Sequence, residues 1–216
     1  MQRGFSPWGH PLTAMTEALA FIEIGGWSSA MVVLDAMEKN ASIRDLQTEL
    51  NDAPGVCIKF TGSVGDLQSA ARAARLTAEA MQTPVLAHVI PRPSPGSRAA
   101  YFAAADFNPL IEQPSVRTPV ETLMNNQANF AVGLIETQGF TAVFEAIDTA
   151  LKTANVEVLA REKLGGGYIT VIIKGDVSAV RAAIDAAKGS VEGLGKLIAA
   201  HVIPSPSQGV LSLLPK

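Results

Sequence analysis

The residues best suited to chemistry in this chain are two histidines and two glutamates that recur in matching contexts. His88 and His201 each precede Val-Ile-Pro, and Glu23 and Glu136 each follow an isoleucine. Histidine titrates near neutral pH and a carboxylate can act as a general base, so such residues could move protons or bind a metal ion. The histidines have no second ligand or nucleophile at a useful spacing, and an acid–base pair of the glutamates would have to form in space. We therefore expect structural, hydrogen-bonded histidines, no catalytic residues and no metal site.

A single cysteine and a run of glycines offer two other kinds of chemistry. Cys57 is the one cysteine of the chain, which excludes an internal disulfide and a multi-thiolate metal site within one copy. Within GVCIKF, a small buried thiol is the simplest interpretation. The glycines of LGGG, Leu164 to Gly167, could offer backbone amides to a phosphate. Because no helix start follows them directly, a hairpin turn is favoured over a phosphate loop.

Composition limits the classes of partner. The 216 residues include 17 Lys and Arg against 20 Asp and Glu, and 48% of them are hydrophobic but only 6% aromatic. A net charge of −3 gives no basic surface for a phosphate backbone or for anionic lipid, so we expect neither nucleic acid nor a membrane as a partner. The sequence has no apolar run that suits a signal peptide or a membrane span, which favours a protein of the reducing cytoplasm.

An internal repeat explains why the same residues recur. A shift of 113 residues, which places Ala131 on Ala18, aligns positions 18–96 with 131–209 without a gap, and 23 of the 79 pairs are identical. A repeat of this length indicates two whole domains and not a solenoid. We expect an N-terminal extension at 1–17, domains at 18–96 and 131–209, a linker at 97–130 that includes a short helix, and a tail at 210–216.

Hydrophobic periodicity predicts the same six elements in each half. The segments ALAFIEI and AVGLIET are typical of strands, and the segments after Gly26 and Gly139 have apolar residues at helical spacing. Two strand-like segments follow, then a second helix, and then a strand that ends at proline, which lacks a backbone donor. The order β-α-β-β-α-β is that of a ferredoxin-like α+β fold, with two helices on one face of a four-stranded antiparallel sheet.

These segments resemble the bacterial microcompartment shell domain. The second half carries the resemblance most clearly, in GLIETQGFTAVFEAIDTALKTANVEVLAREKLGGGYITVIIKGDVSAVRAAIDAA and HVIPSP, whereas the first half has NDAPG in place of LGGG. Both halves start at the Ile-Glu strand and end at His-Val-Ile-Pro, as in the non-permuted tandem class of that family. The resemblance implies a homotrimer that forms a pseudohexamer, and a place beside other shell proteins in a cytoplasmic shell around encapsulated enzymes.

The resemblance also implies which residues form a central pore for small polar metabolites. The hairpin between the second and third strands of each domain would face the symmetry axis. Three copies of Asp52 would then favour neutral or cationic solutes over anions. The implied pore-lining residues are Asn51, Asp52, Ala53, Pro54, Leu164, Gly165, Gly166 and Gly167.

Two further implications concern the edge of the tile and the cofactor. Lys39, Lys152 and Arg92 would lie at the tile edge, and the alternative for the lysines is a solvated cation at a helix C-terminus. Some tandem relatives hold an iron–sulfur cluster through a cysteine on the pore hairpin. Because alanine stands at that place here, no cofactor is expected.

A second class of function stays open on the residues alone. Ferredoxin-like domains also form oligomeric enzymes and ligand-binding regulatory proteins. An enzyme would have a concave pocket with convergent polar groups and a perturbed pKa. A structural tile would instead have flat lateral surfaces and a hole on its axis.

Overall fold

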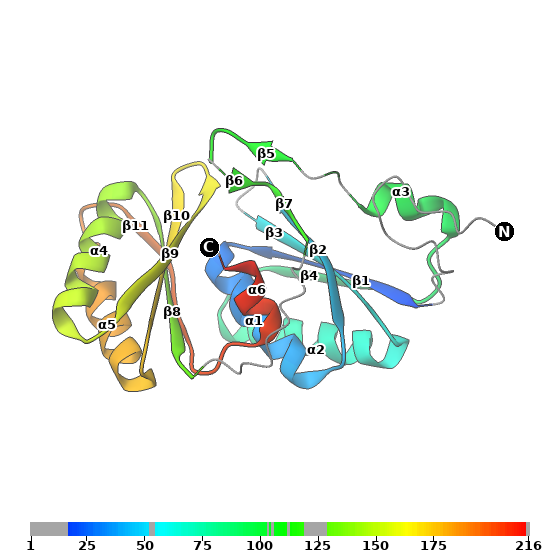
Figure 1. Cartoon of the computed structure of the whole chain (residues 1–216), viewed down its shortest axis with the longest axis horizontal. Helices are drawn as coiled ribbons and strands as arrows, with labels where there is room; N and C mark the ends of the chain where they lie inside the picture. Colours follow the sequence, from blue (N-terminus) through cyan, green and yellow to red (C-terminus); the bar gives the residue numbers. More distant parts are fainter. Residues whose placement is uncertain are drawn as a thin grey trace.

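The described part of the chain forms two units, each a β-sheet with helices on one face, which lie side by side along the long axis (Figure 1). This computed structural model describes residues 17–51, 55–102, 104, 106–111, 113–118 and 129–214. The first unit consists of β1 (Ala18–Gly25), α1 (Trp27–Asn40), β2 (Arg44–Asn51), β3 (Gly55–Gly62), α2 (Val64–Ala80) and β4 (Val85–Ile90). The second consists of β8 (Ala131–Gln138), α4 (Phe140–Thr153), β9 (Glu157–Gly165), β10 (Tyr168–Gly175), α5 (Val177–Ser190) and β11 (Lys196–Ile203).

Both units have the predicted α+β architecture. The strand order is β4-β1-β3-β2 in the first sheet and β11-β8-β10-β9 in the second, and every strand pair between described residues is antiparallel. The register places Glu23 beside Cys57 on β3, and Glu136 beside Thr170 on β10. The β-α-β-β-α-β order expected from the sequence is therefore confirmed in each half.

The segments between and after the two units add elements, most of which the sequence did not predict. They are the one-turn helix η1 (Pro95–Ser97), α3 (Arg98–Tyr101), β5 (Phe107–Asn108), β6 (Gln113–Pro114), β7 (Val116–Arg117) and, after β11, α6 (Gln208–Leu213). A short helix was expected in the linker, and α3 is one. However, β7 pairs with β2 and makes the first sheet five-stranded. Because β2 is otherwise an edge strand, this pairing covers part of its exposed row of backbone donors and acceptors.

Alternating side chains give each sheet a face that packs on its own helices. In β1 the residues Ala20, Ile22 and Ile24 face α1 and α2 and belong to the first hydrophobic core. In β8 the corresponding face carries Ile135 and Gly133. A β-carbon at Gly133 would lie 2.7 Å from Ile173 and 2.8 Å from Val180 of α5, so this glycine permits the close approach of helix and sheet.

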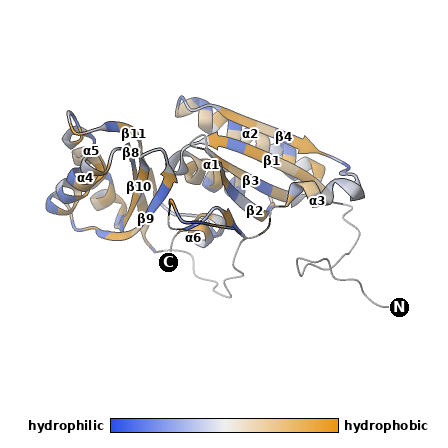
Figure 2. Cartoon of the chain, turned by 90° about the horizontal axis from the view of Figure 1, so that it is seen from above, coloured by the Kyte–Doolittle hydropathy of each residue, from blue (hydrophilic) through white to orange (hydrophobic). Residues whose placement is uncertain are grey.

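The opposite face of the second sheet packs against the first unit. Val132, Leu134, Ile172 and Ile203 point to this side and share a core with residues of α1 and α6. Figure 2 shows α1 between the two sheets, with hydrophobic residues on the elements around it. One helix of the first unit thus helps to bury the sheets of both units.

Candidate functional site

The second predicted pore hairpin is a tight glycine turn between β9 and β10. Gly165, Gly166 and Gly167 all have positive φ angles, of 89°, 59° and 80°, which glycine adopts without steric strain. The backbone carbonyl of Gly167 accepts a hydrogen bond of 2.9 Å from the amide of Gly139. Gly166 and Gly167 are exposed, whereas the Leu164 side chain is buried in the core. The exposed end of this hairpin is therefore backbone.

The first predicted pore hairpin joins β2 to β3. Asn51 and Gly55 pair across it at the ends of the two strands. Asp52, Ala53 and Pro54 lie outside the described residues. Their assignment to a pore stays a prediction.

The three predicted edge residues have different surroundings. Lys39 Nζ donates 2.6 Å hydrogen bonds to Asp35 Oδ2 and to the backbone carbonyl of Ser205, which follows β11 of the other unit. Lys152 is bonded to Asp148 one turn earlier, and this bond raises the lysine pKa. Arg92 is exposed in the turn after β4. Within one chain, Lys39 thus contacts the second unit, while Lys152 and Arg92 stand at the surface.

The start of α1 is fixed to the second unit by a buried carboxylate. Glu136 is fully buried on β8 and accepts hydrogen bonds from the amides of Trp27 (3.2 Å) and Ser28 (3.0 Å). These amides have no partner within the helix, and a carboxylate at a helix N-terminus also interacts well with the helix dipole. Burial raises the pKa of Glu136, although the two amides lower it. A β-carbon at Gly26 would lie 2.8 Å from Glu136 Oε2, so glycine makes this approach possible.

Two carboxylates on α1 itself bind the segment that follows β11. Asp35 Oδ1 accepts a 2.9 Å hydrogen bond from the amide of Ser207, and Glu38 Oε2 accepts one of 2.9 Å from the amide of Gly209. This holds α6 against α1, where Val210 and Leu213 are buried. The second unit is thus bound along the length of α1 and not at one end alone.

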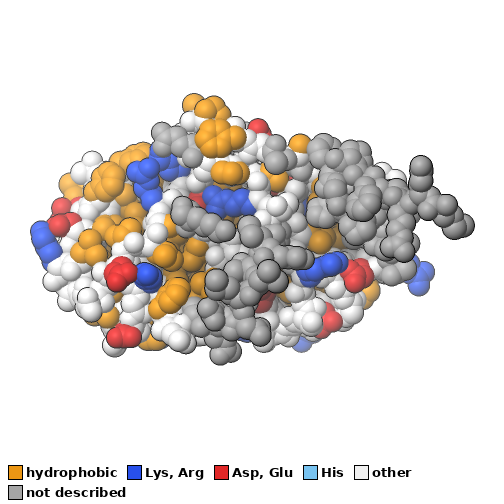
Figure 3. Space-filling model, in the orientation of Figure 1, with side chains coloured by type: hydrophobic (Ala, Val, Ile, Leu, Met, Phe, Trp, Pro, Cys, Tyr) orange, Lys and Arg blue, Asp and Glu red, His pale blue; other side chains and the backbone are white. Residues whose placement is uncertain are grey.

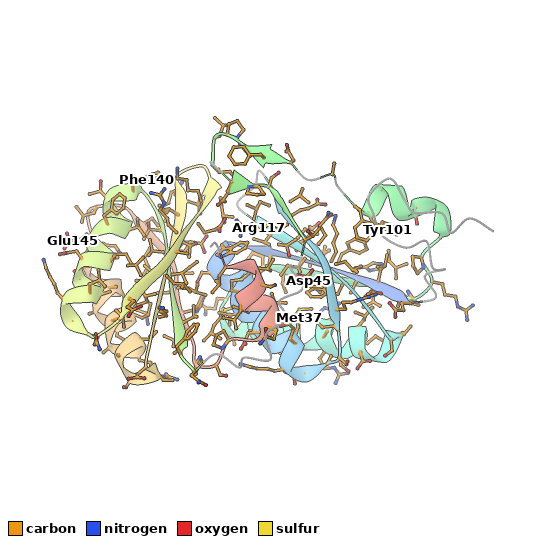
Figure 4. The ribbon with its side chains drawn as sticks, in the orientation of Figure 1. Met37, Asp45, Tyr101, Arg117, Phe140 and Glu145 are labelled. Carbon is orange, nitrogen blue, oxygen red and sulfur yellow. The ribbon has the colours of Figure 1, made fainter. Side chains whose placement is uncertain are left out.

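Arg117 joins the linker to both units. Its Nη2 donates to Glu162 Oε1 of β9 at 2.6 Å, and its Nη1 donates to the carbonyl of Leu213 at 2.8 Å. The guanidinium also lies 4.7 Å from the centre of the Trp27 ring. Figure 4 shows this arginine near the middle of the molecule, close to α6. Sequence reasoning did not identify Arg117 or Glu162.

A second acidic site lies where β2 passes α1. Burial raises the pKa of Asp45 to about 7, and the nearby negative charge of Glu38 adds to the effect. Figure 4 labels Asp45 on β2 and Met37 on α1. Because Glu38 also binds the amide of Gly209, this acidic pair adjoins the contact between the two units.

The remaining candidate residues do not converge. His88 is exposed on β4 and His201 is half-buried on β11, where burial and then Lys188 lower its pKa. Burial raises the pKa of Cys57 to about 11, so at neutral pH it is a thiol and a poor nucleophile. Across the described ranges, no three His, Cys, Asp or Glu residues are grouped to hold a metal ion. The described helices also include none with the length and hydropathy of a membrane span.

Comparisons with known proteins give the following matches. A family model described as the BMC domain matches residues 18–93 and 131–206. The bacterial microcompartment shell protein PduA of Citrobacter freundii is 48% identical over 86 residues, which are 40% of this chain and 92% of PduA. The carboxysome assembly protein CcmO of Synechococcus elongatus is 30% identical over 199 residues, 92% of this chain and 69% of CcmO. A solved microcompartment protein from Desulfitobacterium hafniense DCB matches with a TM-score of 0.36 and 24% identity, over 88% of this chain and 96% of that one.

Proposed function

Because the chain belongs to the BMC domain family, with one domain in each half, we propose that it is a trimeric tile in the facets of a bacterial microcompartment shell. Three copies supply six domains around one axis, and neighbouring shell proteins meet the tile at its lateral edges. The shell stands in the cytoplasm and surrounds enzymes. The names of the relatives, a shell protein and an assembly protein, support a structural role over the alternative of an enzyme or regulatory protein.

The observation that carries this proposal is the contact between the two domains. It is heterologous, because a helix of the first domain meets the helix-free sheet face of the second. Contacts of this type repeat head to tail and build a ring when the rotation closes. A two-domain chain supplies two of six positions, so three chains complete the ring that the family resemblance implies.

In this tile the two hairpins line a central pore for small polar metabolites. The exposed glycine turn at Gly166 and Gly167 supports this role, because it presents backbone donors and acceptors without side chains that would narrow an opening. The β2–β3 hairpin alternates with it around the axis. The proposed lining therefore has threefold and not sixfold symmetry.

The proposal is tested by the mass of the assembly and by its appearance. Sedimentation of the purified chain should give a particle of three copies, each of 22.6 kDa. Electron microscopy of concentrated protein should show hexagonally tiled sheets with an opening at the centre of each tile. A stable monomer or dimer near neutral pH would contradict the proposal.

The tile edge should depend on Lys39 and Lys152 together. Each occurs three times around the trimer, and a single exposed ion pair contributes little because water and salt screen it. Replacing both lysines by alanine should abolish sheets in electron micrographs and leave trimers in sedimentation. Lys188→Ala is the matched control, because Lys188 is also an exposed lysine on a helix and pairs with Asp185 at 2.9 Å. If the double variant forms sheets as abundant as those of the parent, the two lysines are only solvated cations at helix C-termini and do not join tiles.

A further inference from the structure

The linker between the two domains forms a small β-ribbon beside the proposed pore hairpins. Its strands β5 and β6 pair antiparallel. At its base the amide of Ser115 donates to the carbonyl of Asp106 at 3.0 Å. We call its described residues, 106–111 and 113–115, the linker ribbon. Because β5 and β6 have two residues each, the position of the linker ribbon must be fixed by its contacts with the two domains.

The base of the linker ribbon is held at the first proposed pore hairpin. The amide of Leu50 donates a 2.8 Å hydrogen bond to the carbonyl of Ser115. Beyond this bond, β7 continues along β2 and pairs with Thr48 and Glu49. Leu50 directly precedes Asn51, the first of the predicted pore-lining residues. The linker ribbon thus begins where β2 reaches its hairpin.

The other strand of the linker ribbon is held at the second proposed pore hairpin. Gln113 Nε2 of β6 donates to the backbone carbonyl of Lys163 in β9. Ile111 is buried, and its Cγ2 atom would lie 3.8 Å from a β-carbon at Gly165. Figure 1 shows β5 and β6 beside the end of β9 and β10 where the chain turns. One ribbon therefore contacts both hairpins of the chain.

The outer surface of the linker ribbon is apolar. Leu110 is 88% exposed and Phe107 is 62% exposed, the two largest values among the large hydrophobic side chains of the described residues. The amide of Leu110 donates to Asn108 Oδ1 at 2.9 Å, which fixes the turn. In Figure 3, hydrophobic side chains project at the top of the molecule, where Figure 1 draws this turn. Neighbouring exposed apolar side chains of this size indicate a surface that meets a partner.

We propose that the linker ribbons of three chains form an apolar collar around the central pore, with Leu110 and Phe107 of each copy directed at the axis. This inference rests on the proposed trimer and its pore, and it names the element that selects among solutes. Since the linker ribbon contacts both hairpins, it lies near the axis if the hairpins line the pore. Rotational symmetry brings identical side chains face to face, which apolar side chains tolerate and like charges do not.

The collar favours small uncharged metabolites over ions of either sign. An apolar constriction holds water poorly, and an ion that enters it loses hydration without gaining a partner. A small uncharged solute loses less hydration on the same path. The predicted effect of Asp52 is different, because a carboxylate changes the ratio of cations to anions, whereas the collar lowers the passage of both.

Chemical crosslinking tests whether the three ribbons meet. Leu110→Cys is made in a Cys57→Ser background, because Cys57 is the one native thiol. The variant is treated with a short bis-maleimide at a protein concentration that gives trimers in sedimentation and no sheets in electron micrographs. Covalently linked pairs of chains should appear on denaturing gels. Leu76→Cys in the same background is the control, because Leu76 is 61% exposed on α2, and it should give no linked chains.

Conductance of single trimers in a planar bilayer tests the effect on ions. Leu110→Lys and Leu110→Glu each place three charges at the constriction and should raise the conductance several-fold above that of the parent. The lysine variant should shift the permeability ratio toward anions, and the glutamate variant should shift it toward cations. The matched controls Leu76→Lys and Leu76→Glu should conduct as the parent does. Because Leu110 is almost fully exposed, its variants should keep the parent's circular dichroism spectrum.

The outcomes separate the collar from the proposed function. A parent that does not trimerise overturns both. Trimers whose Leu110→Cys copies stay unlinked, or whose charged variants both conduct as the parent does, keep the tile and overturn the collar. Chains that become linked only in sheets would place the linker ribbon between neighbouring tiles, which also overturns it. If a variant at Leu110 loses the trimer, Phe107→Lys and Phe107→Glu replace the charged pair, with the same expected shifts.

Discussion

Replacing Arg117 by methionine should lower the free energy of unfolding by about 3–5 kcal/mol, because it leaves a buried carboxylate without its cation. Glu162 is fully buried and Arg117 is 14% exposed, so water does not replace the lost guanidinium. The variant also loses the hydrogen bond to the Leu213 carbonyl. Urea denaturation followed by circular dichroism at pH 8 measures the effect.

The loss should depend on pH with a defined sign. Burial raises the pKa of Glu162 above its ordinary value of 4.5, and Arg117 opposes the rise. Without Arg117 the folded pKa increases further, so the folded variant retains a proton that the unfolded chain releases. The destabilisation should therefore be largest at a pH above the pKa of Glu162 in the folded variant. It should shrink as the pH falls toward the pKa of Glu162 in the unfolded chain.

Two further variants complete the test of this ion pair. Adding Glu162→Gln should restore part of the stability, because the buried charge is then gone. Lys188→Met, which breaks the exposed pair with Asp185, should change the stability by less than about 1 kcal/mol. If Arg117→Met lowers the free energy of unfolding no more than Lys188→Met does, the linker is not held by Glu162.

Asp45→Asn should stabilise the chain at pH 8 by up to about 4 kcal/mol, which is the equivalent of roughly three pKa units. In the parent the pKa of Asp45 is raised from 3.8 to about 7, by burial first and by Glu38 second. The folded chain then binds a proton that the unfolded chain has lost, so parent stability falls as the pH rises from about 4 through about 7. Urea denaturation at a series of pH values compares the two proteins.

The difference between the two proteins should vanish near pH 3, where Asp45 is protonated in both states of the parent. Glu38→Gln is the matched control: it removes the neighbouring charge, keeps an oxygen for the amide of Gly209, and should weaken the pH dependence without abolishing it. Equal pH slopes for the parent and Asp45→Asn would contradict the assignment.

The sequence predicted those parts of the fold that repeat or alternate. The strands β1 and β8 and the helices after Gly26 and Gly139 have a clear period, and the repeat doubles the evidence for each. The elements β7 and α6 were missed because they are two and six residues long. Their formation depends on an edge strand and a helix surface that exist only after the units fold.

The candidate site was predictable only where a local motif marks it. The three consecutive glycines of the β9–β10 hairpin predict a turn, and their positive φ angles in the structure are those of a turn. By contrast, Arg117 bonds to partners 45 and 96 residues away, which leave no local pattern. The partners of Glu136 could not be predicted, because they are amides of α1, more than 100 residues earlier, and amides have no sequence signature.

The contact between α1 and the second sheet also has a consequence for how assembly depends on protein concentration. A linker within the same chain holds the two surfaces at an effective concentration of the order of millimolar, so their association does not depend on dilution. In the proposed trimer, half of the contacts around the ring therefore form during folding, and the encounter of free chains supplies only the other half. Dilution then removes subunits in whole two-domain steps, and a ring with an odd number of domains does not form.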